Sequence, residues 1–276
     1  MPYLCVFSIL FIMMKTKIKK IVLLGAGKLG MNLATAILDK GYEISEVYNR
    51  QAITGSRLAE KVGAIYRKTP ESLTPDADLY ILAVRDSVIV SLMKRIPKVN
   101  GIIVHTSGSV DLDVFKGRFK NYGVIWPLQT FNRKPLSFRH VPLCIESNNK
   151  DNLKILKAFA LSLSTIVQPC TSDERKILHV AAVFASNFTN YMYSIAEELL
   201  DEYKIDHRLL NPIIRQTVEN SYLGNNFKMQ TGPASRGDSE TIQKHLVLLS
   251  SLPDYQSVYE SITQGIIKQK NRYVEL

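Results

Sequence analysis

Residues 21–30, which read IVLLGAGKLG, determine how the first half of this chain folds. The four consecutive apolar residues Ile21–Leu24 are typical of a strand buried on both faces of a sheet. A helical pattern follows at 28–39, and the turn between them carries three glycines with the spacing GxGxxG. In that order, the glycines permit a tight turn, close approach of a ligand to the backbone, and close packing of helix on strand.

This turn predicts a dinucleotide site. The N-terminus of the following helix presents unpaired N–H groups and the positive end of its dipole, which together favour a pyrophosphate. The residues expected to hold it are Gly25, Ala26, Gly27, Lys28, Leu29 and Gly30. The alternative is a glycine-rich turn without a ligand, and the position between a buried strand and a helix argues against it.

Beyond this turn, short apolar runs alternate with helical patterns as far as Pro169. Strands are expected at 21–24, 43–48, 77–84, 101–105, 123–126, 141–146 and 165–168, and helices at 28–39, 56–61, 87–95 and 152–163. Continuous apolar strands between helices indicate an α/β fold with a doubly wound, mostly parallel sheet. After Pro169 the pattern is helical, at 172–204, 207–223, 241–251 and 254–271, with Ser172 and Asp173 as candidate caps. An all-α C-terminal domain is therefore expected to follow the sheet.

These patterns predict a cofactor-binding domain at 15–169 and a helical domain at 170–276 for substrate binding and dimerisation. Residues 3–14 are apolar, but they are too few to cross a bilayer, which takes about 20 residues. Basic residues follow this stretch, whereas a signal peptide carries them before it. We interpret residues 1–14 as an over-extended start, with a membrane-associating segment as the alternative.

Composition narrows the class of protein. The 276 residues are 46% hydrophobic and 22% charged, which excludes disordered and collagen-like chains. Three cysteines are too few for a disulfide framework or a zinc site, so we expect no metal and a reducing, cytoplasmic compartment. The net charge of +10 arises in residues 1–170, which carry +12, whereas residues 171–276 carry −2. The basic part favours a phosphate-rich small molecule or a solvated surface, and neither a nucleic acid nor a membrane is expected as a partner.

The residues at the end of the second strand indicate whether the chain binds NAD or NADP. A carboxylate at this position would accept hydrogen bonds from the ribose 2′-hydroxyl of NAD. This strand instead ends at Asn49-Arg50, where the amide can bind the ribose and the guanidinium a 2′-phosphate. NADP is therefore the expected cofactor, with a solvated Arg50 as the alternative. FAD is disfavoured because the sequence shows no second flavin-holding region.

Polar loops follow three more strands at their carboxyl ends, where ligands of open α/β sheets bind. Their sequences are AVRD at 83–86, HTSGS at 105–109 and WPLQTF at 126–131. Contacts to the cofactor are expected from Ala83, Val84, Arg85, Thr106 and Ser107, and contacts to a substrate from His105, Ser109 and Gln129. Turn formation and helix capping are the alternative for each loop.

Together these motifs resemble a known family. GAGKLG, the Asn49-Arg50 end, AVRD and HTSGS are similar to the N-terminal domain of pyrroline-5-carboxylate reductase and of the deazaflavin-dependent NADP oxidoreductases. WPLQTF, residues 175–188 and residues 230–238 resemble a bacterial family of NADP oxidoreductases that joins a Rossmann-like domain to a helical domain of unknown function. The resemblance covers nearly everything from residue 17 onward. It implies a Rossmann fold, NADP and a homodimer formed through the helical domain, but no substrate.

The first long helix carries polar residues in its apolar middle. Lys176, His179, Asn187 and Asn190 fall within roughly an 80° arc of the helix. Similar layouts in ketopantoate reductase and the β-hydroxyacid dehydrogenases place a Lys and an Asn one turn apart, and this chain departs from that pattern. We interpret His179 as a proton donor, because histidine titrates near neutrality, with Asn187 as a substrate-orienting amide and Lys176 as a further candidate. In the alternative, Lys176 is solvated and the amides bind neighbouring helices.

The segment 231–238 is a second candidate in the helical tail. Arg236 can hold a substrate carboxylate, and Asp238 is expected to cap the following helix. Two functions are compatible with all of these features. The first is an NADP-dependent oxidoreductase that transfers hydride to or from a C=O or C=N carbon of a small polar metabolite. The second is a non-catalytic NADP-binding sensor or scaffold, which the missing Lys–Asn pair favours.

Overall fold

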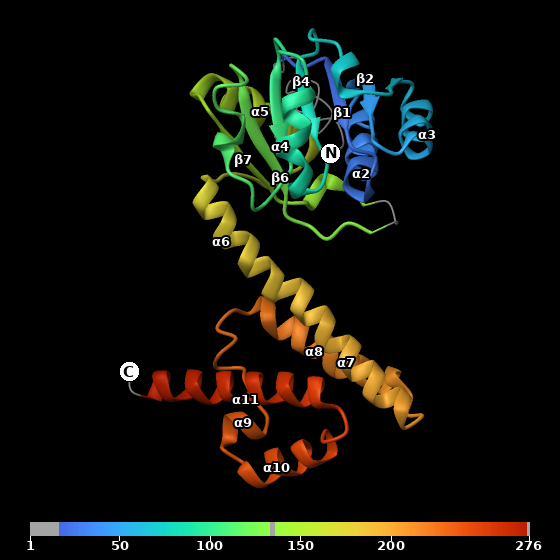
Figure 1. Cartoon of the computed structure of the whole chain (residues 1–276). Helices are drawn as coiled ribbons and strands as arrows, with labels where there is room; N and C mark the ends of the chain where they lie inside the picture. Colours follow the sequence, from blue (N-terminus) through green and yellow to red (C-terminus); the bar gives the residue numbers. More distant parts are fainter. Residues whose placement is uncertain (1–16, 133–135, 275–276) are drawn as a thin grey trace, which may run out of the picture. The chain divides into compact units, whose positions relative to one another are not determined.

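The first part of the chain forms one eight-stranded sheet (Figure 1). The computed structural model describes residues 17–132 and 136–274, so the interpretation of residues 1–14 lies outside the described residues. The strands run in the order β3-β2-β1-β4-β5-β6-β7-β8. Their bounds are β1 Lys20–Leu24, β2 Glu43–Tyr48, β3 Ile65–Arg67, β4 Leu79–Leu82, β5 Ile102–His105, β6 Tyr122–Pro127, β7 Leu143–Ser147 and β8 Val167–Pro169.

The expected doubly wound, mostly parallel sheet is confirmed. Strands β1 to β6 pair in parallel, and the exception is the antiparallel pair of β6 with β7. The parallel strands therefore end at the same edge of the sheet, where the polar loops of the sequence lie. The short strand β3 was not anticipated from the sequence, because its three residues are only partly buried and give no apolar run.

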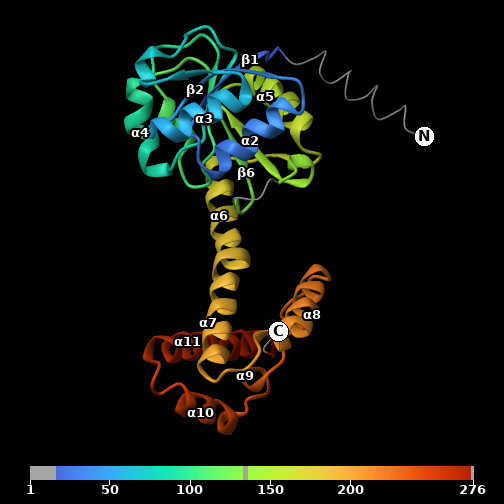
Figure 2. The same ribbon diagram turned by 90° about the vertical axis from the view of Figure 1, so that its right-hand side faces the viewer.

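Helices cover both faces of the sheet. On one face, α2 (Lys28–Leu38), α3 (Ala52–Val62) and α5 (Lys150–Leu163) bury apolar side chains against the strands. On the other face lie α4 (Asp86–Arg95) and the short 3₁₀ helices η1 (Pro70–Ser72) and η2 (Leu112–Phe115). Figure 2 shows α4 on one side of the sheet and α5 on the other. Alternate residues of β1 serve the two faces: Ile21 and Leu23 belong to the first cluster, and Val22 and Leu24 to the second.

A long helical stretch begins after β8. It consists of α6 (Ser172–Ala182), a π-helical segment at Val183–Phe188 and α7 (Thr189–Glu202). The expectation that Ser172 or Asp173 caps this stretch is wrong, because Thr171 is the N-cap and forms a capping box with Glu174. The Ser172 hydroxyl is instead used at the sheet, where it donates to Glu146 at 2.8 Å.

The remaining elements are helical, as expected. They are η5 (His207–Leu210), α8 (Asn211–Tyr222), α9 (Pro233–Arg236), α10 (Ser239–Leu248) and α11 (Pro253–Val274), and η3 (Phe138–His140) lies in the sheet part. The expected cap of α10 is confirmed, since the Asp238 carboxylate accepts a hydrogen bond from the Thr241 N–H at 3.0 Å.

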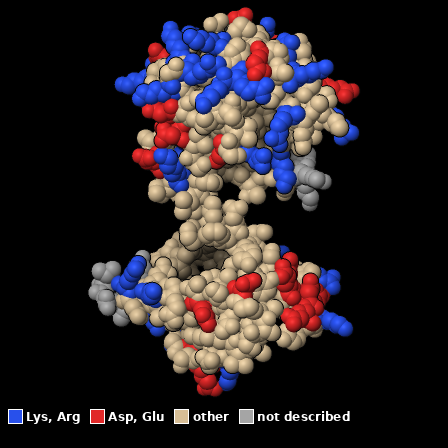
Figure 3. All heavy atoms as spheres, viewed as in Figure 1, with Lys and Arg blue, Asp and Glu red and all other residues tan. Residues whose placement is uncertain are grey.

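The chain divides into two compact units between Asn187 and Phe188. We call residues 17–187 the sheet unit and residues 188–274 the helical unit. The sheet itself ends at Pro169, so the first unit also contains α6 and most of the π-helical segment. The predicted boundary between a cofactor-binding domain at 15–169 and a substrate-binding and dimerisation domain at 170–276 stays a proposal. In the face shown by Figure 3, Lys and Arg cover much of the surface of the sheet unit, whereas the helical unit shows both acidic and basic side chains on a largely neutral surface.

Candidate cofactor and active site

The glycine turn after β1 has the geometry of an anion cradle. Gly25 adopts φ +117°, and a Cβ there would lie 2.2 Å from the Ala83 carbonyl oxygen. A Cβ on Gly30 would lie 2.1 Å from the Gly25 carbonyl oxygen, which explains the close packing of α2 on the turn. Gly27 differs, because a Cβ there meets no atom within 4 Å. The backbone at Gly27 is therefore open to a ligand.

The first turn of α2 has no charged or polar cap of its own. No side chain caps the helix at Gly27, and no acidic residue lies in its first turn. The turn is held from the side by Asn49, whose Oδ1 accepts a hydrogen bond from the Ala26 N–H at 3.1 Å. The Asn49 amide nitrogen donates to the Gln51 carbonyl at 2.9 Å and to Thr54 at 2.7 Å. Asn49 thus fixes the end of β2 against the phosphate turn.

A cavity of about 800 Å³ opens at this turn. Its lining combines the turn, the end of β2, the end of β4 and one face of α4: Gly25, Gly27, Lys28, Leu29, Tyr48, Asn49, Arg50, Gln51, Ala83, Val84, Arg85, Val88, Ser91, Leu92 and Arg95. Four of these side chains are cationic and none is acidic. An open glycine cradle beside four cations fits a dinucleotide with an additional phosphate.

Most of the expected cofactor residues line this cavity, but Ala26 and Gly30 lie buried just beneath it. The face of α4 was missed from the sequence. Its lining residues, 88, 91, 92 and 95, have the spacing of one helix face, which is the signal that identifies them.

The loop after β5 is held in place by hydrogen bonds of its own buried side chains. Thr106 donates to the Leu82 carbonyl at 3.2 Å, and the Ser107 hydroxyl accepts from the N–H groups of Ser109 and Val110 at 3.1 and 3.0 Å. Ser109 is exposed and donates to the Asp86 carboxylate at 2.6 Å, which ties the loop to the start of α4. Thr106 and Ser107 therefore support the edge of the sheet, and the structure does not bring them into the 800 Å³ cavity.

His105 lies in the core, where it is fully buried and packs against Phe115 at a ring-centroid distance of 5.6 Å. Burial, together with the nearby Arg175 charge, lowers its pKa to about 4. Its Nδ1 accepts a hydrogen bond from the Ser107 N–H at 3.2 Å, so the neutral ring shapes the loop. His105 lines neither the 800 Å³ cavity nor the second cavity described below, and its contact with a substrate stays a prediction.

His179 lies at the same edge of the sheet. Its ring meets Trp126 in a T-shaped contact at 5.6 Å, and a Cβ on Gly108 would lie 3.0 Å from its Cγ. Gly108 is required here, since the same Cβ would lie 2.7 Å from the Trp126 ring. The His105–Ser109 and Trp126–Phe131 loops and α6 thus converge on one imidazole, which is partly exposed.

A second cavity, of about 430 Å³, lies beside this imidazole. It is lined by the loop after β6 and by the long helix: Trp126, Leu128, Gln129, Thr130, Leu178, His179, Ala181, Ala182, Val183, Ala185, Ser186 and Asn187. The cavity brings together Gln129, His179 and Asn187, three residues singled out from the sequence. The Thr130 and Ser186 hydroxyls lie 3.1 Å apart and join the loop to the π-helical segment.

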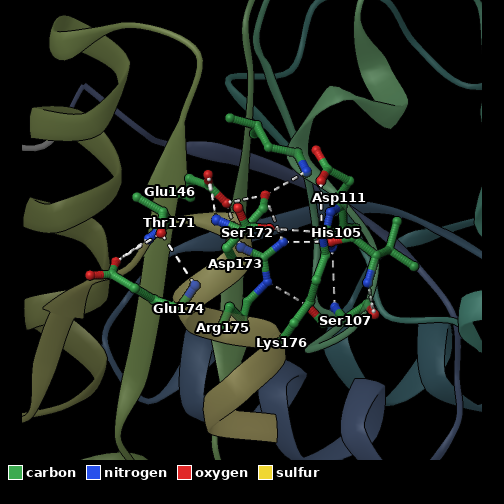
Figure 4. A network of polar contacts seen from close by, with 12 residues as sticks. His105, Ser107, Asp111, Glu146, Thr171, Ser172, Asp173, Glu174, Arg175 and Lys176 are labelled. Atoms are coloured by element: carbon green, nitrogen blue, oxygen red, sulfur yellow. Dashed lines mark hydrogen bonds and ion pairs between the residues drawn. The ribbon is translucent and has the colours of Figure 1, made fainter.

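A buried arginine holds the start of α6 to the sheet (Figure 4). The Arg175 guanidinium donates from Nε to the Ser107 carbonyl at 3.1 Å, and from its other nitrogens to the Val110 carbonyl and the Glu146 carboxylate. Glu146 also accepts from the Ser172 N–H at 2.9 Å. This network joins α6 to β7 and to the loop after β5. Sequence reasoning did not assign it a role, because a buried partner for Arg175 lies 29 residues away in the chain.

The other two predicted site residues lie elsewhere. Lys176 points to carboxylates, with its Nζ 3.1 Å from both Asp111 and Asp173 (Figure 4). These hydrogen bonds raise the pKa of Lys176, and the hydrogen bonds that Asp111 accepts lower the pKa of that carboxyl. Lys176 lines neither cavity. Arg236 is exposed at the end of α9 in the helical unit, and its contact with a substrate carboxylate stays a prediction.

Family models match both parts of the chain. Residues 20–107 match the model described as "NADP oxidoreductase coenzyme F420-dependent", and residues 141–266 match a domain of unknown function, DUF2520. A solved structure of a "putative NADP oxidoreductase" from Bacteroides fragilis is 37% identical, with a TM-score of 0.83, and covers 91% of this chain and 98% of its own. The chain belongs to this family of NADP oxidoreductases. Its cofactor is therefore NADP, which supplies or accepts hydride when bound.

More distant structures share the fold. A pyrroline-5-carboxylate reductase from Streptococcus pyogenes is 15% identical with a TM-score of 0.58, covering 91% of this chain and 98% of its own. A reductive aminase from Aspergillus terreus, in complex with NADPH and ethyl-5-oxohexanoate, is 17% identical with a TM-score of 0.61 and covers 94% of both chains. A comparison with curated proteins gave no match.

Proposed function

We propose that this NADP oxidoreductase reduces a C=N or C=O carbon of a small polar metabolite with NADPH, and that His179 donates the proton. The observation that carries the proposal is the position of His179. Its ring lies against Trp126 and above Gly108, at the edge of the sheet where β1, β4, β5 and β6 end. The cofactor cavity opens at the same edge, beyond β1, β2 and β4.

The second cavity supports this assignment of roles. Trp126 and Leu178 offer an apolar wall, while the amides of Gln129 and Asn187 offer donors and acceptors to a polar group. A partly exposed imidazole between them is suited to general acid catalysis. Lys176 is held by two carboxylates, so we assign it to fixing the start of α6 rather than to the chemistry.

The experiment uses NADPH and a panel of cyclic imines and 2-oxo acids, and it follows nicotinamide absorbance. Oxidation of NADPH with at least one member supports a reductase, and the His179→Asn variant should abolish most of it. Tight NADPH binding without turnover of any member would favour the non-catalytic sensor or scaffold. Nicotinamide fluorescence in the same samples measures binding and separates these two outcomes from a failure to bind the cofactor.

We also propose a homodimer formed through residues 170–276. In the helical unit, Ala234 and Leu249 are the buried apolar residues among those the structure describes, whereas Tyr222 and Leu223 are 83% and 71% exposed. Exposed apolar patches of this kind mark interfaces. Light scattering at micromolar concentration should give twice the 31.2 kDa chain mass. Leu223→Glu should shift the mass to that of a monomer, whereas Ile53→Glu, on exposed α3, should not.

We also propose that the protein works in the cytoplasm. None of the described helices is both long and apolar enough to cross a membrane. Cys144 and Cys170 are free thiols, and burial raises the pKa of Cys144 to about 12. A pair of unlinked cysteines supports a reducing, cytoplasmic compartment.

A further inference from the structure

Four cations line the cofactor cavity, and Arg95 differs from the other three. Lys28, Arg50 and Arg85 form no ion pair with any side chain in the described part of the chain. Arg95 is the last residue of α4 and is paired with Glu71 of η1. Its Nε donates to one Glu71 oxygen at 2.6 Å and its terminal nitrogen to the other at 3.1 Å. The Arg95 guanidinium that lines the cavity is therefore already bound to the Glu71 carboxylate through two hydrogen bonds.

In this ion pair, a phosphate can replace the Glu71 carboxylate as the partner of Arg95. Both side chains are 51% exposed, so the pair is solvated and contributes little to the stability of the fold. A phosphate accepts the same parallel hydrogen bonds as a carboxylate and carries more charge. The mutual hydrogen bonds raise the pKa of Arg95 and lower the pKa of Glu71, so both groups are ionised near neutrality.

The position of Arg95 in the cavity indicates which phosphate of the cofactor it can bind, the 2′-phosphate or the pyrophosphate. Arg95 lines it together with Tyr48, Asn49 and Arg50 at the end of β2. In dinucleotide folds this strand end faces the ribose 2′ position, whereas the pyrophosphate lies at the glycine turn. Arg95 therefore lines the same cavity as the residue expected to bind a 2′-phosphate, and Tyr48 at the end of β2 is near enough to contribute to raising the pKa of Arg95.

We propose that Arg95 is a second ligand for the 2′-phosphate of NADP, together with Arg50, and that Glu71 is the counter-ion it gives up on binding. Glu71 then competes with the phosphate for the same hydrogen bonds of the Arg95 guanidinium. Removing Glu71 is therefore expected to strengthen binding of a 2′-phosphorylated ligand and to leave other adenosine ligands unchanged.

Calorimetry with 2′,5′-ADP and with 5′-ADP tests this assignment without any substrate or turnover. Arg95→Gln should weaken 2′,5′-ADP by about tenfold, the loss of one charge-assisted bidentate contact, and leave 5′-ADP unchanged. Glu71→Gln should strengthen 2′,5′-ADP by about threefold. The matched control is Arg208→Gln in the helical unit, which removes an exposed arginine bound to Asp206 and should change neither affinity.

Three results would overturn the proposal. Equal weakening of both ligands by Arg95→Gln would mean that Arg95 contacts a part that the two ligands share, the adenosine or the 5′-phosphate, and no weakening would leave it as a surface ion pair. Weaker binding of 2′,5′-ADP to Glu71→Gln would mean that the pair acts as a unit. Thermal unfolding of each variant checks that it is folded, and Glu71→Gln supplies a result of opposite sign that loss of structure cannot mimic. None of these outcomes depends on the proposed reaction, because no chemical step is measured.

Discussion

In the sheet unit, the apolar side chains of β1, β4 and β5 are almost completely buried, whereas in the helical unit Tyr222, Leu223 and Val247 remain exposed. The polar groups differ in the same way. Arg175 in the sheet unit is fully buried and donates four hydrogen bonds, whereas the ion pairs of the helical unit, such as that of Arg208, lie on its surface. Within one chain, the sheet unit buries most of its apolar side chains by itself, whereas the helical unit leaves many of its apolar side chains exposed.

This difference indicates where function resides. The cofactor cavity and the cavity beside His179 are lined wholly by residues of the sheet unit, which ends at Asn187. The proposed homodimer would cover the exposed apolar surface of the helical unit with a second copy of the chain. Changes in the sheet unit are therefore expected to act on cofactor binding, on the chemical step and on the stability of that unit.

The largest expected effect is on turnover. His179→Asn should lower the turnover number by roughly 10²–10⁴, the usual contribution of a general acid, and leave NADPH affinity unchanged. Asparagine keeps the side chain polar but cannot donate a proton at neutral pH. Steady-state kinetics and nicotinamide fluorescence on one sample measure both quantities. An unchanged turnover number would remove His179 from the chemistry.

A control without substrate is available because Trp126 is the single tryptophan of the chain. Its indole lies against the His179 ring in a T-shaped contact, so replacing that ring changes the surroundings of the indole. His179→Asn should therefore shift or rescale the tryptophan emission at constant pH. An emission spectrum identical to that of the unmodified protein would contradict the packing described here.

The second effect concerns the stability of the sheet unit. Arg175→Met should lower its free energy of unfolding by about 3–5 kcal/mol, because Glu146 is left without its buried partner. The double variant with Glu146→Leu should recover part of that loss. Lys176→Met, which removes an exposed pair on the next residue, should produce no measurable change. Chemical denaturation followed by circular dichroism measures all three, and equal losses for Arg175→Met and Lys176→Met would contradict the account.

The third effect is a dependence of stability on pH. Burial lowers the pKa of His105 from 6.5 to about 4, so the unfolded chain binds a proton more readily than the folded chain between those values. Stability should therefore fall as the pH is lowered from about 6.5 and level off below about 4, with a total loss of about 3 kcal/mol from this group. His105→Asn keeps an acceptor for the Ser107 N–H and should flatten this dependence. An identical pH profile for the variant would rule out His105 as its source.

The smallest effect is on cofactor choice. NADPH should bind at least ~10-fold more tightly than NADH, a difference of about 1.4 kcal/mol, because Arg50 lies at the end of β2 in place of a carboxylate. Arg50→Ala should remove most of that preference by weakening NADPH alone. Arg57→Ala, on the neighbouring helix and outside the cavity lining, is the control. Equal affinities of the unmodified protein for NADPH and NADH would contradict the assignment.

Much of the sheet unit could be predicted from the sequence, because local signals and tertiary structure agree there. The apolar run before Gly25 is β1, and the glycine spacing predicts the tight turn and the open backbone at Gly27 that follow it. His179 was found on the long helix because a polar residue in an apolar helix middle requires a partner. Its actual partner, Trp126, lies 53 positions earlier and follows only from the order of the strands.

Other parts could not be predicted from local patterns. The HTSGS sequence is typical of a ligand-binding loop, yet the His105 ring packs in the core against Phe115 and the Ser107 carbonyl accepts a hydrogen bond from the buried Arg175. Lys176 and Arg175 are adjacent and similar in sequence terms, but helix geometry turns one to solvent-exposed carboxylates and buries the other. Which charge is buried depends on contacts between distant residues, and a single sequence does not show these contacts.

The central claim, that this chain transfers hydride from NADPH to a C=N or C=O carbon, is tested most directly with labelled cofactor. NADPH carrying deuterium at the transferable position of the nicotinamide is incubated with the most rapidly reduced member of the imine and 2-oxo acid panel. Mass spectrometry of the product then counts the deuterium it has gained. The account predicts one deuterium on the reduced carbon in the unmodified protein, and much slower labelling with His179→Asn. A protein that binds NADPH and yields no labelled product from any member would contradict it.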